Sequence, residues 1–409
     1  MKVIQVNCVY KTGSTGNIVY DIHKYLRDTG CDSLVAYGRG ENTSDDGVYR
    51  ICGNLYAKMN NLFSRISGLM YGGCFLSTRR LIKFIENEKP DIVHVHCING
   101  YFVNIYRLIA WLKTSKIKTV ITLHAEFMHT ANCSYALDCD KWKTGCGNCS
   151  NYRKITKSWL FDRTHKSWQL MKDAFCGFDD LTVASVSPWL KGRAEVSPIL
   201  KNANHTVVLN GLDTDVFKPC DTTHLRDKYG LNGKKVVFHA TPSFNDDPHH
   251  IKGGYYVLRV AEKMLREYPD VRFIVAGACE QGIKVPENVI LLGKVANRNM
   301  MAEFYSLADV TLLTSQKETF SMVVAESLCC GTPVVGFKAG APEQIAIEQY
   351  SSFVEYADTE ALYSKLLNNL KKEKNMYVTE LRNLAQEKYS KGAMVRKYAE
   401  IYDMKKEVH

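Results

Sequence analysis

Two glutamates eight residues apart are the most informative acidic residues of this sequence. Glu318 follows a short strand-like run, and Glu326 lies within a segment that is predicted to be a helix from Ser321 to Cys329. Because a helix rises about 1.5 Å per residue, one carboxylate is placed in the loop and the other at least one turn into the helix. Such carboxylates can accept hydrogen bonds from sugar and ribose hydroxyls. On spacing alone, a helix cap with surface charge explains the same residues equally well.

Three other candidate sites follow predicted strands, where ligands of open parallel sheets bind. Lys252 precedes a predicted helix, Gly254–Glu267, and a lysine at a helix N-terminus suits a diphosphate. His124 ends the predicted strand Thr119–Leu123, although a lone histidine is more often a surface or core residue. Gly13 and Gly16 lie before a predicted helix that starts at Asn17 and could let a phosphate approach the backbone; a plain tight turn is an equally good interpretation.

Four cysteines fall within 17 residues: Cys133, Cys139, Cys146 and Cys149. In a reducing compartment this density favours a closed tetrahedral zinc site with four thiolate ligands, which would fold an insert too short to build its own core. Unpaired or redox-labile cysteines are the alternative, because the cluster contains only one CxxC pair. The sequence therefore predicts a structural zinc ion that takes no part in catalysis.

The pattern of the whole chain predicts where these residues sit. Short β-branched runs alternate with helical segments throughout, which is typical of α/β domains with parallel sheets. At 409 residues the chain exceeds the usual size of a single core, so two domains are expected. We place the boundary near residue 200. Residues 1–200 then form one doubly wound domain with a Cys-rich insert at 130–150, and residues 201–409 form a second one followed by helices on its outside.

Composition and charge narrow the functional classes. Apolar residues make up 45% and charged residues 23% of the chain, which indicates a folded protein. No run approaches the roughly 18 apolar residues of a membrane span, and no secretory signal is recognisable, so a cytoplasmic location is expected. The net charge is +10, and residues 1–200 hold 26 Lys and Arg against 17 Asp and Glu. A basic surface that includes Arg79, Arg80 and Lys83 fits a membrane-docking face or ordinary solvated helices equally well.

The run from Glu318 to Glu326, together with Gly331-Thr-Pro-Val-Val335, resembles the Glu-x7-Glu signature of retaining glycosyltransferase family 4, which has the GT-B fold. The resemblance covers nearly the whole chain. Further matching segments are the glycine loop 13–16, Asp91-Ile-Val-His-Val-His96, Thr122-Leu-His124, Asn210-Gly-Leu-Asp213, Val216-Phe-Lys-Pro219, Lys252-Gly253 and Leu292-Gly-Lys-Val295. The insert after the Leu-His motif resembles a Cys- and Trp-containing insert of some bacterial polysaccharide glycosyltransferases.

The resemblance implies roles for individual residues. Glu326 would bind the ribose hydroxyls of a nucleotide-sugar donor, and Glu318 the hydroxyls of its sugar. His124 would lie beside the reacting carbon. Lys252 would bind the diphosphate, with help from the backbone amides of Phe320, Ser321 and Met322. The backbone near Val295 would contact the base. Gly13 and Gly16 would lie beside the diphosphate and the acceptor.

Two positions depart from the family pattern. The loop from Thr241 to Ile251 lacks the second diphosphate cation that many relatives carry. Ala125 stands where relatives often have an aspartate after the histidine, so Glu126 becomes the nearest carboxylate that could orient His124. Leaving-group stabilisation would then depend more heavily on Lys252 and on helix dipoles.

The family implies two Rossmann-like domains that face each other across a cleft and transfer a hexose-type sugar with retention of configuration and without a catalytic metal. A UDP- or GDP-sugar would be the donor, and a saccharide or lipid-linked acceptor would place the enzyme in capsule or lipopolysaccharide synthesis, at the inner face of the plasma membrane. Two other classes stay open. A sugar-nucleotide epimerase or hydrolase can use the same fold, and a zinc-containing nucleic-acid-binding protein ranks last because the cluster lacks paired CxxC knuckles with a recognition helix.

Overall fold

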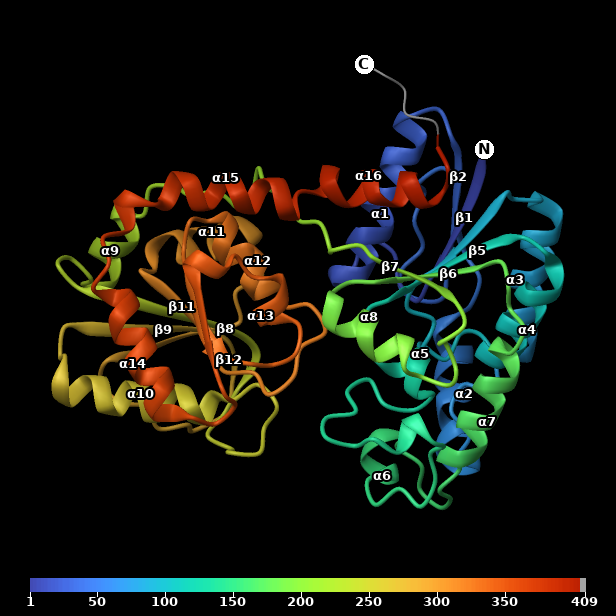
Figure 1. Ribbon diagram of the computed structural model, residues 1–409, viewed down its shortest axis with the longest axis horizontal. Helices are drawn as coiled ribbons and strands as arrows, with labels where there is room; N and C mark the ends of the chain where they lie inside the picture. The colour runs from blue at the N-terminus through green and yellow to red at the C-terminus, as the bar shows by residue number, and fades with distance from the viewer. Residues whose placement is uncertain (405–409) are drawn as a thin grey trace. The chain divides into compact units, whose positions relative to one another are not determined.

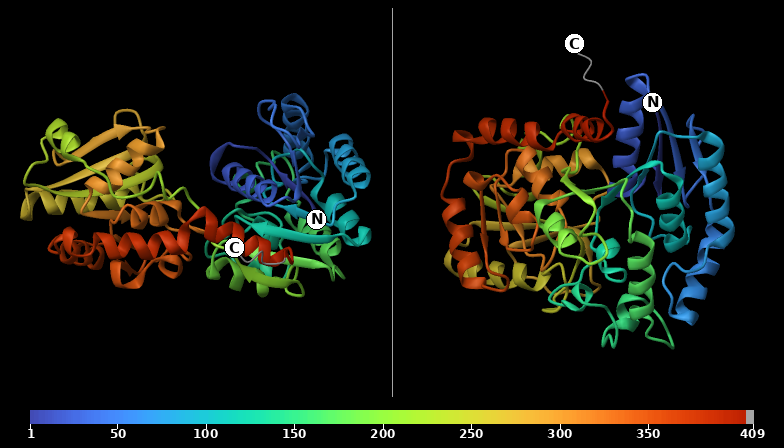
Figure 2. Two further views of the ribbon diagram at one scale, coloured as in Figure 1. Left: turned by 90° about the horizontal axis from the view of Figure 1, so that it is seen from above. Right: turned by 45° about the vertical axis from the view of Figure 1, so that its right-hand side comes forward.

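The structure is a computed structural model that describes residues 1–404, and it divides into two compact units (Figures 1 and 2). Unit 1 comprises residues 1–208 together with the chain from Val395 onward, and unit 2 comprises Leu209–Met394. The chain thus leaves unit 1 eight residues after the expected boundary and comes back to it at its C-terminal end. We describe each unit by itself.

Unit 1 is built on a seven-stranded parallel sheet in the order β3-β2-β1-β4-β5-β6-β7. Its inner strands are short apolar runs with almost every residue buried, as parallel strands covered on both faces require. The strands are β1 (Lys2–Asn7), β2 (Asp32–Tyr37), β3 (Val48–Arg50), β4 (Ile92–Val95), β5 (Lys118–Leu123), β6 (Leu181–Ser185) and β7 (Asn204–Val207).

The helices of unit 1 connect these strands in the right order for a doubly wound fold. They are α1 (Gly13–Asp28), α2 (Asn54–Ser67), α3 (Phe75–Glu88), α4 (Ile105–Ser115), α5 (Phe127–Thr130), α6 (Tyr152–Ile155), α7 (Thr164–Phe175) and α8 (Pro188–Glu195), with a 3-10 turn at Lys141–Lys143. The C-terminal helix α16 (Lys391–Ile401) starts in unit 2 and ends in unit 1, where Tyr398 and Tyr402 are buried (Figure 1).

Unit 2 repeats the architecture with a six-stranded parallel sheet in the order β10-β9-β8-β11-β12-β13. Its strands are β8 (Lys235–Phe244), β9 (Val271–Cys279), β10 (Val289–Gly293), β11 (Val310–Leu313), β12 (Val334–Phe337) and β13 (Ser351–Val354). Its helices are α9 (Thr223–Tyr229), α10 (Gly254–Glu267), α11 (Arg298–Leu307), α12 (Met322–Cys329), α13 (Pro342–Ile345), α14 (Thr359–Leu370) and α15 (Val378–Tyr389), with 3-10 turns at Glu348–Tyr350 and Lys374–Met376.

The core of unit 2 shows why these segments are helices and strands. One face of α10 buries Val257, Ala261 and Met264 against the sheet, and α14 adds Leu362 and Leu366 to the same cluster. Apolar residues at helical spacing on one face are the signal that predicted α10. The predicted fold class, two Rossmann-like α/β domains, is confirmed, while α14 proves to be part of the core rather than an outer helix.

Some elements differ from the expectations. The sequence did not predict the edge strands β3, β7, β10 and β13, because each is only three to five residues long and carries few fully buried positions. The pattern after the Cys-rich insert predicts a helix over 158–174, and the observed helix α7 begins later, at Thr164. Within residues 1–404 no helix combines the length and apolar character that crossing a bilayer requires.

Candidate active site

Lys252 and Glu318 meet at the carboxyl edge of the unit 2 sheet. Lys252 follows β8 and Glu318 follows β11, two neighbouring strands at the point where the strand order reverses. Such switch points are where open α/β sheets bind ligands. Lys252 Nζ lies 2.6 Å from Glu318 Oε1, and the two side chains are only 20% and 14% exposed. The sequence predicted both residues, and the structure pairs them directly.

A glycine fixes the Lys252 loop against β11. Gly253 has a φ of +66°, which favours glycine, and a Cβ atom at this position would lie 2.1 Å from the carbonyl oxygen of Thr314. The Thr314 hydroxyl in turn donates a hydrogen bond to the carbonyl of Lys252 at 3.2 Å. Since any side chain at residue 253 would collide with the backbone that follows β11, the lysine is held in place by close packing.

The start of α12 carries backbone strain and an unsatisfied polar group. Ser321 has a φ of +82°, a conformation that residues with a side chain rarely adopt. Its buried hydroxyl has no hydrogen-bond partner among the described residues. Phe320 is buried beside Tyr389, and Met322 is the first residue of the helix. Strain and an unpaired buried hydroxyl at a helix N-terminus indicate a place prepared for a polar ligand.

Glu326 lies in the second turn of α12, partly buried, and its carboxylate accepts a hydrogen bond from the Tyr305 hydroxyl at 3.0 Å. Burial raises the pKa of Glu326 to about 7, against the opposing effects of the Tyr305 hydrogen bond and of Arg298. The site therefore holds one carboxylate paired with a lysine and a second one in a less polar setting. Tyr305 was not predicted, because it is 21 residues away in the sequence and only the packing of α11 on α12 brings it near.

The pKa of Glu326 predicts how stability depends on pH. Because the folded pKa is above the ordinary value of 4.5, the unfolded chain ionises first as the pH rises, and the wild-type protein loses stability until the pH exceeds about 7. At about 1.4 kcal/mol per pKa unit, the loss approaches about 3 kcal/mol. Glu326→Gln removes this ionisation but keeps an acceptor for Tyr305. Urea unfolding should show Glu326→Gln gaining stability over wild type at pH 8 and not at pH 4, and an equal difference at both pH values would contradict the assignment.

Val295, the expected base contact, lies in the loop after β10, the edge strand beside β9. This loop follows Gly293, the last residue of β10, whose φ is +70°. Because all strands of the unit 2 sheet are parallel, the loops after β8, β10 and β11 emerge at the same edge. The predicted residues of unit 2 are therefore gathered at one edge, with Lys252 and Glu318 in direct contact.

Gly13 and Gly16 belong to the first turn of α1 rather than to a loop before it, since the helix begins at Gly13 and not at Asn17. Gly13 has a φ of +65°, and a Cβ on Gly16 would lie 3.2 Å from the amide nitrogen of Lys11. The helix N-terminus follows β1 after a short loop, residues 8–12, at the carboxyl edge of the unit 1 sheet. The first N–H groups of a helix have no acceptor within it, so contact of this turn with a phosphate stays a prediction.

His124 stands at the head of a buried hydrogen-bond chain in unit 1. Its Nε2 lies 3.3 Å from Nδ1 of His96, and Nε2 of His96 lies 3.3 Å from Oε1 of Gln5. The Gln5 amide group donates to the carbonyl of Val19 at 3.2 Å. Burial lowers the pKa of His124 to about 4 and that of His96 well below its usual range, so both rings are neutral at pH 7.

This chain determines which nitrogen of His124 carries the proton. The Gln5 oxygen can only accept, so His96 Nε2 must donate to it, and the neutral His96 ring then offers Nδ1 as an acceptor. His124 Nε2 must therefore carry its proton and donate it to His96. The Nδ1 atom of His124 is left without a proton and can only accept a hydrogen bond. The sequence did not predict this chain, because Gln5, His96 and His124 follow or belong to three different strands that only the packing of the sheet brings together.

Glu126, which we expected to orient His124, binds other partners in the structure. The Glu126 carboxylate binds the Arg193 guanidinium, lies 3.4 Å from His129 and accepts the amide of Ala136 at 2.7 Å. These partners tie the start of the Cys-rich insert to α8. His124 itself contacts His96, at 3.3 Å.

The structure does not support the predicted zinc site. Within residues 1–404 no group of three or more His, Cys, Asp or Glu side chains is arranged to hold a metal ion. Cys133, Cys146 and Cys149 are partly buried and Cys139 is exposed, all as free thiols. The insert is instead anchored to α7 and α8 through Trp142. The Trp142 side chain is buried, and the guanidinium of Arg193 lies 4.9 Å from the centre of its ring. The backbone carbonyl of Trp142 accepts a hydrogen bond from the indole N–H of Trp168 at 2.9 Å.

Two family models match consecutive parts of the chain. Residues 15–216 match the model described as Glycosyltransferase Family 4, and residues 236–372 match the model described as Glycosyl transferases group 1. The first falls almost entirely within unit 1 and the second within unit 2. Together they include all of the candidate residues except Gly13.

Similar proteins carry glycosyltransferase names. N-acetyl-alpha-D-glucosaminyl L-malate synthase of Bacillus anthracis is 26% identical over 336 residues, which span 79% of this chain and 77% of the relative. A D-inositol 3-phosphate glycosyltransferase of Mycobacterium sp. (strain KMS) is 31% identical over 164 residues, 36% of each chain.

Solved structures show the same fold over nearly the full length. A glycosyltransferase from Rickettsia africae matches with a TM-score of 0.64 at 16% identity and covers 98% of this chain and 97% of its own. Anabaena HepE in complex with UDP matches with a TM-score of 0.63 at 15% identity over 98% and 99% of the two chains. The chain is therefore a glycosyltransferase with the GT-B fold, in which a family 4 domain is followed by a group 1 domain.

Proposed function

We propose that this glycosyltransferase transfers a hexose-type sugar, with retention of configuration, from a UDP- or GDP-sugar to a saccharide or lipid-linked acceptor. The observation that carries the proposal is the set of groups at one edge of the unit 2 sheet: the Lys252–Glu318 pair, the unsatisfied hydroxyl of Ser321 and the Glu326 carboxylate. The structures of Anabaena HepE with UDP and with UDP-glucose show which kind of ligand a protein of this fold holds. Bacterial surface polysaccharide synthesis, at the inner face of the plasma membrane, is the proposed setting.

The groups at this edge support a set of proposed donor contacts. The diphosphate binds Lys252 and the free N–H groups at the start of α12, where Ser321 also offers its hydroxyl. Lys252 is then shared between the diphosphate and Glu318, which frees a Glu318 oxygen for the hydroxyls of the donor sugar. Glu326 accepts hydrogen bonds from the ribose, and Val295 borders the base.

Catalysis in this proposal depends on positioning and on stabilising the departing nucleotide. Lys252 and the α12 N-terminus neutralise charge on the diphosphate as the bond to the sugar breaks. A phosphate oxygen takes the acceptor's proton, and the acceptor attacks from the face that the nucleotide leaves. His124, neutral and with an acceptor-only Nδ1, holds a sugar hydroxyl and donates no proton to the leaving group. A sugar-nucleotide hydrolase is the competing activity.

The stereochemistry of the product tests this proposal. The protein is incubated with UDP-glucose or GDP-mannose, both α-linked donors, and with candidate saccharide acceptors, and the products are followed by proton NMR. We expect a new α-linked glycoside together with free UDP or GDP. A β-linked product would contradict retention, and free sugar as the sole product with every acceptor would favour the hydrolase.

A further inference from the structure

Helix α2 turns its apolar residues toward solvent. Within this 14-residue helix only Ala57 and Ser64 are buried. Its large apolar side chains, by contrast, are 47–73% exposed: Leu55, Met59, Leu62, Phe63 and Ile66. Their spacing of four, three, one and three residues places them on one face of the helix. An amphipathic helix with its apolar face away from the core marks an interaction surface.

Two neighbouring segments extend this face. Phe75 and Leu76 at the start of α3 are exposed, and the amide of Leu76 donates to the hydroxyl of Tyr56 in α2 at 3.2 Å. The amide of Trp159 donates to the carbonyl of Arg65 at the end of α2 at 2.9 Å. Trp159 and the two residues after it are exposed as well. We call the combined surface the apolar face: Leu55, Met59, Leu62, Phe63, Ile66, Phe75, Leu76, Trp159, Leu160 and Phe161.

The segments that carry the apolar face contain no acidic residues. Residues 47–85 include six basic residues and no Asp or Glu, and residues 141–161 include five basic residues and no Asp or Glu. The chain as a whole has 43 acidic residues, so this local absence is pronounced. The basic residues are Arg50, Lys58, Arg65, Arg79, Arg80 and Lys83 in the first segment and Lys141, Lys143, Arg153, Lys154 and Lys157 in the second.

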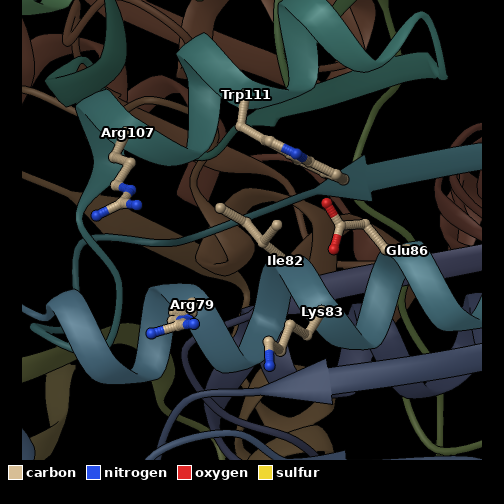
Figure 3. Close-up of a pocket in the computed structure, with 6 residues that line it drawn as sticks. All are labelled: Arg79, Ile82, Lys83, Glu86, Arg107 and Trp111. Atoms are coloured by element: carbon tan, nitrogen blue, oxygen red, sulfur yellow. The ribbon is translucent and has the colours of Figure 1, made fainter.

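A cavity of about 300 Å³ lies between α3 and α4 (Figure 3). Arg79 and Lys83 of α3 and Arg107 of α4 line it with Trp111 and Ile82, and Glu86 lies toward the Trp111 end. The side chains of the three cations make no hydrogen bond or ion pair within the described part of the chain. A second hollow, next to the apolar face, is lined by Arg65, Arg153, Lys157, Ser158 and Trp159.

We propose that this side of unit 1 docks onto an anionic lipid membrane. The apolar face enters the boundary between headgroups and acyl chains, and the phosphate of an anionic lipid headgroup binds between Arg79, Lys83 and Arg107. A second copy of this chain is a poor occupant, because its own acid-free segments would bring like charges together. The inference rests on the proposed function, whose lipid-linked acceptor is presented at such a membrane.

The apolar part of the proposal is tested by sedimentation with vesicles of phosphatidylglycerol and phosphatidylcholine. The triple variant Leu55→Asp, Leu76→Asp and Leu160→Asp changes only exposed side chains, so folding should be preserved, as a melting curve checks. We expect wild type to sediment with the vesicles and the triple variant to stay in solution. Met376→Asp, at an 87% exposed position in unit 2, is the matched control and should bind like wild type. Trp159 fluorescence should shift to the blue on binding, and this shift should be absent in Trp159→Phe.

The charged part is tested with Arg79→Gln, Lys83→Gln and Arg107→Gln combined. At about fivefold per cation near an anionic surface, the partition coefficient should fall roughly 100-fold, and pure phosphatidylcholine should bind wild type weakly. Lys371→Gln with Lys372→Gln, exposed cations of unit 2, is the control and should change little.

Three results would overturn the docking proposal: equal binding by wild type and both triple variants, no binding to anionic vesicles, or binding of inorganic phosphate or an acidic macromolecule without vesicle binding. Donor and acceptor are absent from this assay, so its outcome is independent of transferase activity. Vesicle binding by a protein that transfers no sugar would contradict the proposed function and leave the docking surface intact. Sugar transfer to a water-soluble acceptor by a protein that does not bind vesicles would contradict the docking surface and leave the proposed function intact.

Discussion

Lys252→Met is expected to lower the turnover number for sugar transfer by about 10²–10³-fold, the usual loss when one charge-stabilising group is removed from a transition state. The expectation follows from the position of Lys252 at the switch point of the unit 2 sheet, where the described loop before it offers no second basic side chain. The nucleotide would then depart with its charge balanced only by the N-terminus of α12. Steady-state kinetics with a saturating donor measure the effect.

Two controls separate this loss from a loss of folding. Lys263→Met breaks an ion pair to Glu360 of the same 2.6 Å length, but on an exposed surface of unit 2, and should leave turnover and stability nearly unchanged. Glu318→Gln removes the partner of Lys252 and keeps the lysine, so nucleotide affinity should stay at or above that of wild type while turnover falls. Wild-type turnover by a folded Lys252→Met protein would show that this lysine does not stabilise the leaving group.

The second large effect concerns His96, which we assign as a positioning residue for His124. His96→Leu removes the acceptor of the His124 Nε2 proton and should lower turnover about 10–100-fold with little change in KM, because His124 loses its tautomer and orientation. His96→Asn places an oxygen close to the former Nδ1 atom and should restore most of the activity. Nitrogen NMR of labelled imidazoles should show His124 protonated at Nε2 in wild type and in His96→Asn.

His94 provides the matched control for His96. Its ring centre lies 3.9 Å from that of His96, with the two rings tilted, and its nitrogens contact the hydroxyls of Thr122 at 2.8 Å and Tyr402 at 2.5 Å. His94→Phe should therefore weaken the attachment of the C-terminal segment and lower stability, with the tautomer of His124 unchanged. If His96→Leu and His94→Phe reduce turnover equally, or if His124 is protonated at Nδ1 in wild type, the positioning role is wrong.

The sequence predicted the parts of the fold in which local pattern and burial agree. Helix α10 was predicted at its observed bounds because a glycine precedes a clear amphipathic repeat. The apolar pattern before Glu88 predicts one helical stretch, whereas the structure has two helices, and the missed signal was Gly68, whose φ of +73° ends α2. The return of α16 to unit 1 depends on long-range contacts of Tyr398 and Tyr402, which carry no local signal.

The same distinction applies to the site. Lys252, Glu318 and Glu326 could be identified from motif spacing, and parallel strands then bring the loops that carry them to one edge. The strain at Ser321, the Tyr305 hydroxyl and the Gln5–His96–His124 chain could not, since each depends on how separate segments pack. The zinc prediction was drawn from cysteine density alone, and that density did not reveal that Trp142 anchors the insert to α7 and α8.

Calorimetric titration of UDP and GDP into the wild-type protein and into Lys252→Met, without acceptor, tests most directly that unit 2 holds a nucleotide-sugar donor. We expect wild type to bind one of the two nucleotides with a clear preference. Lys252→Met should bind it about 10–100-fold more weakly, as the loss of a hydrogen bond to a charged group implies. No binding of either nucleotide to wild type, or equal binding by both proteins, would contradict the donor site described here.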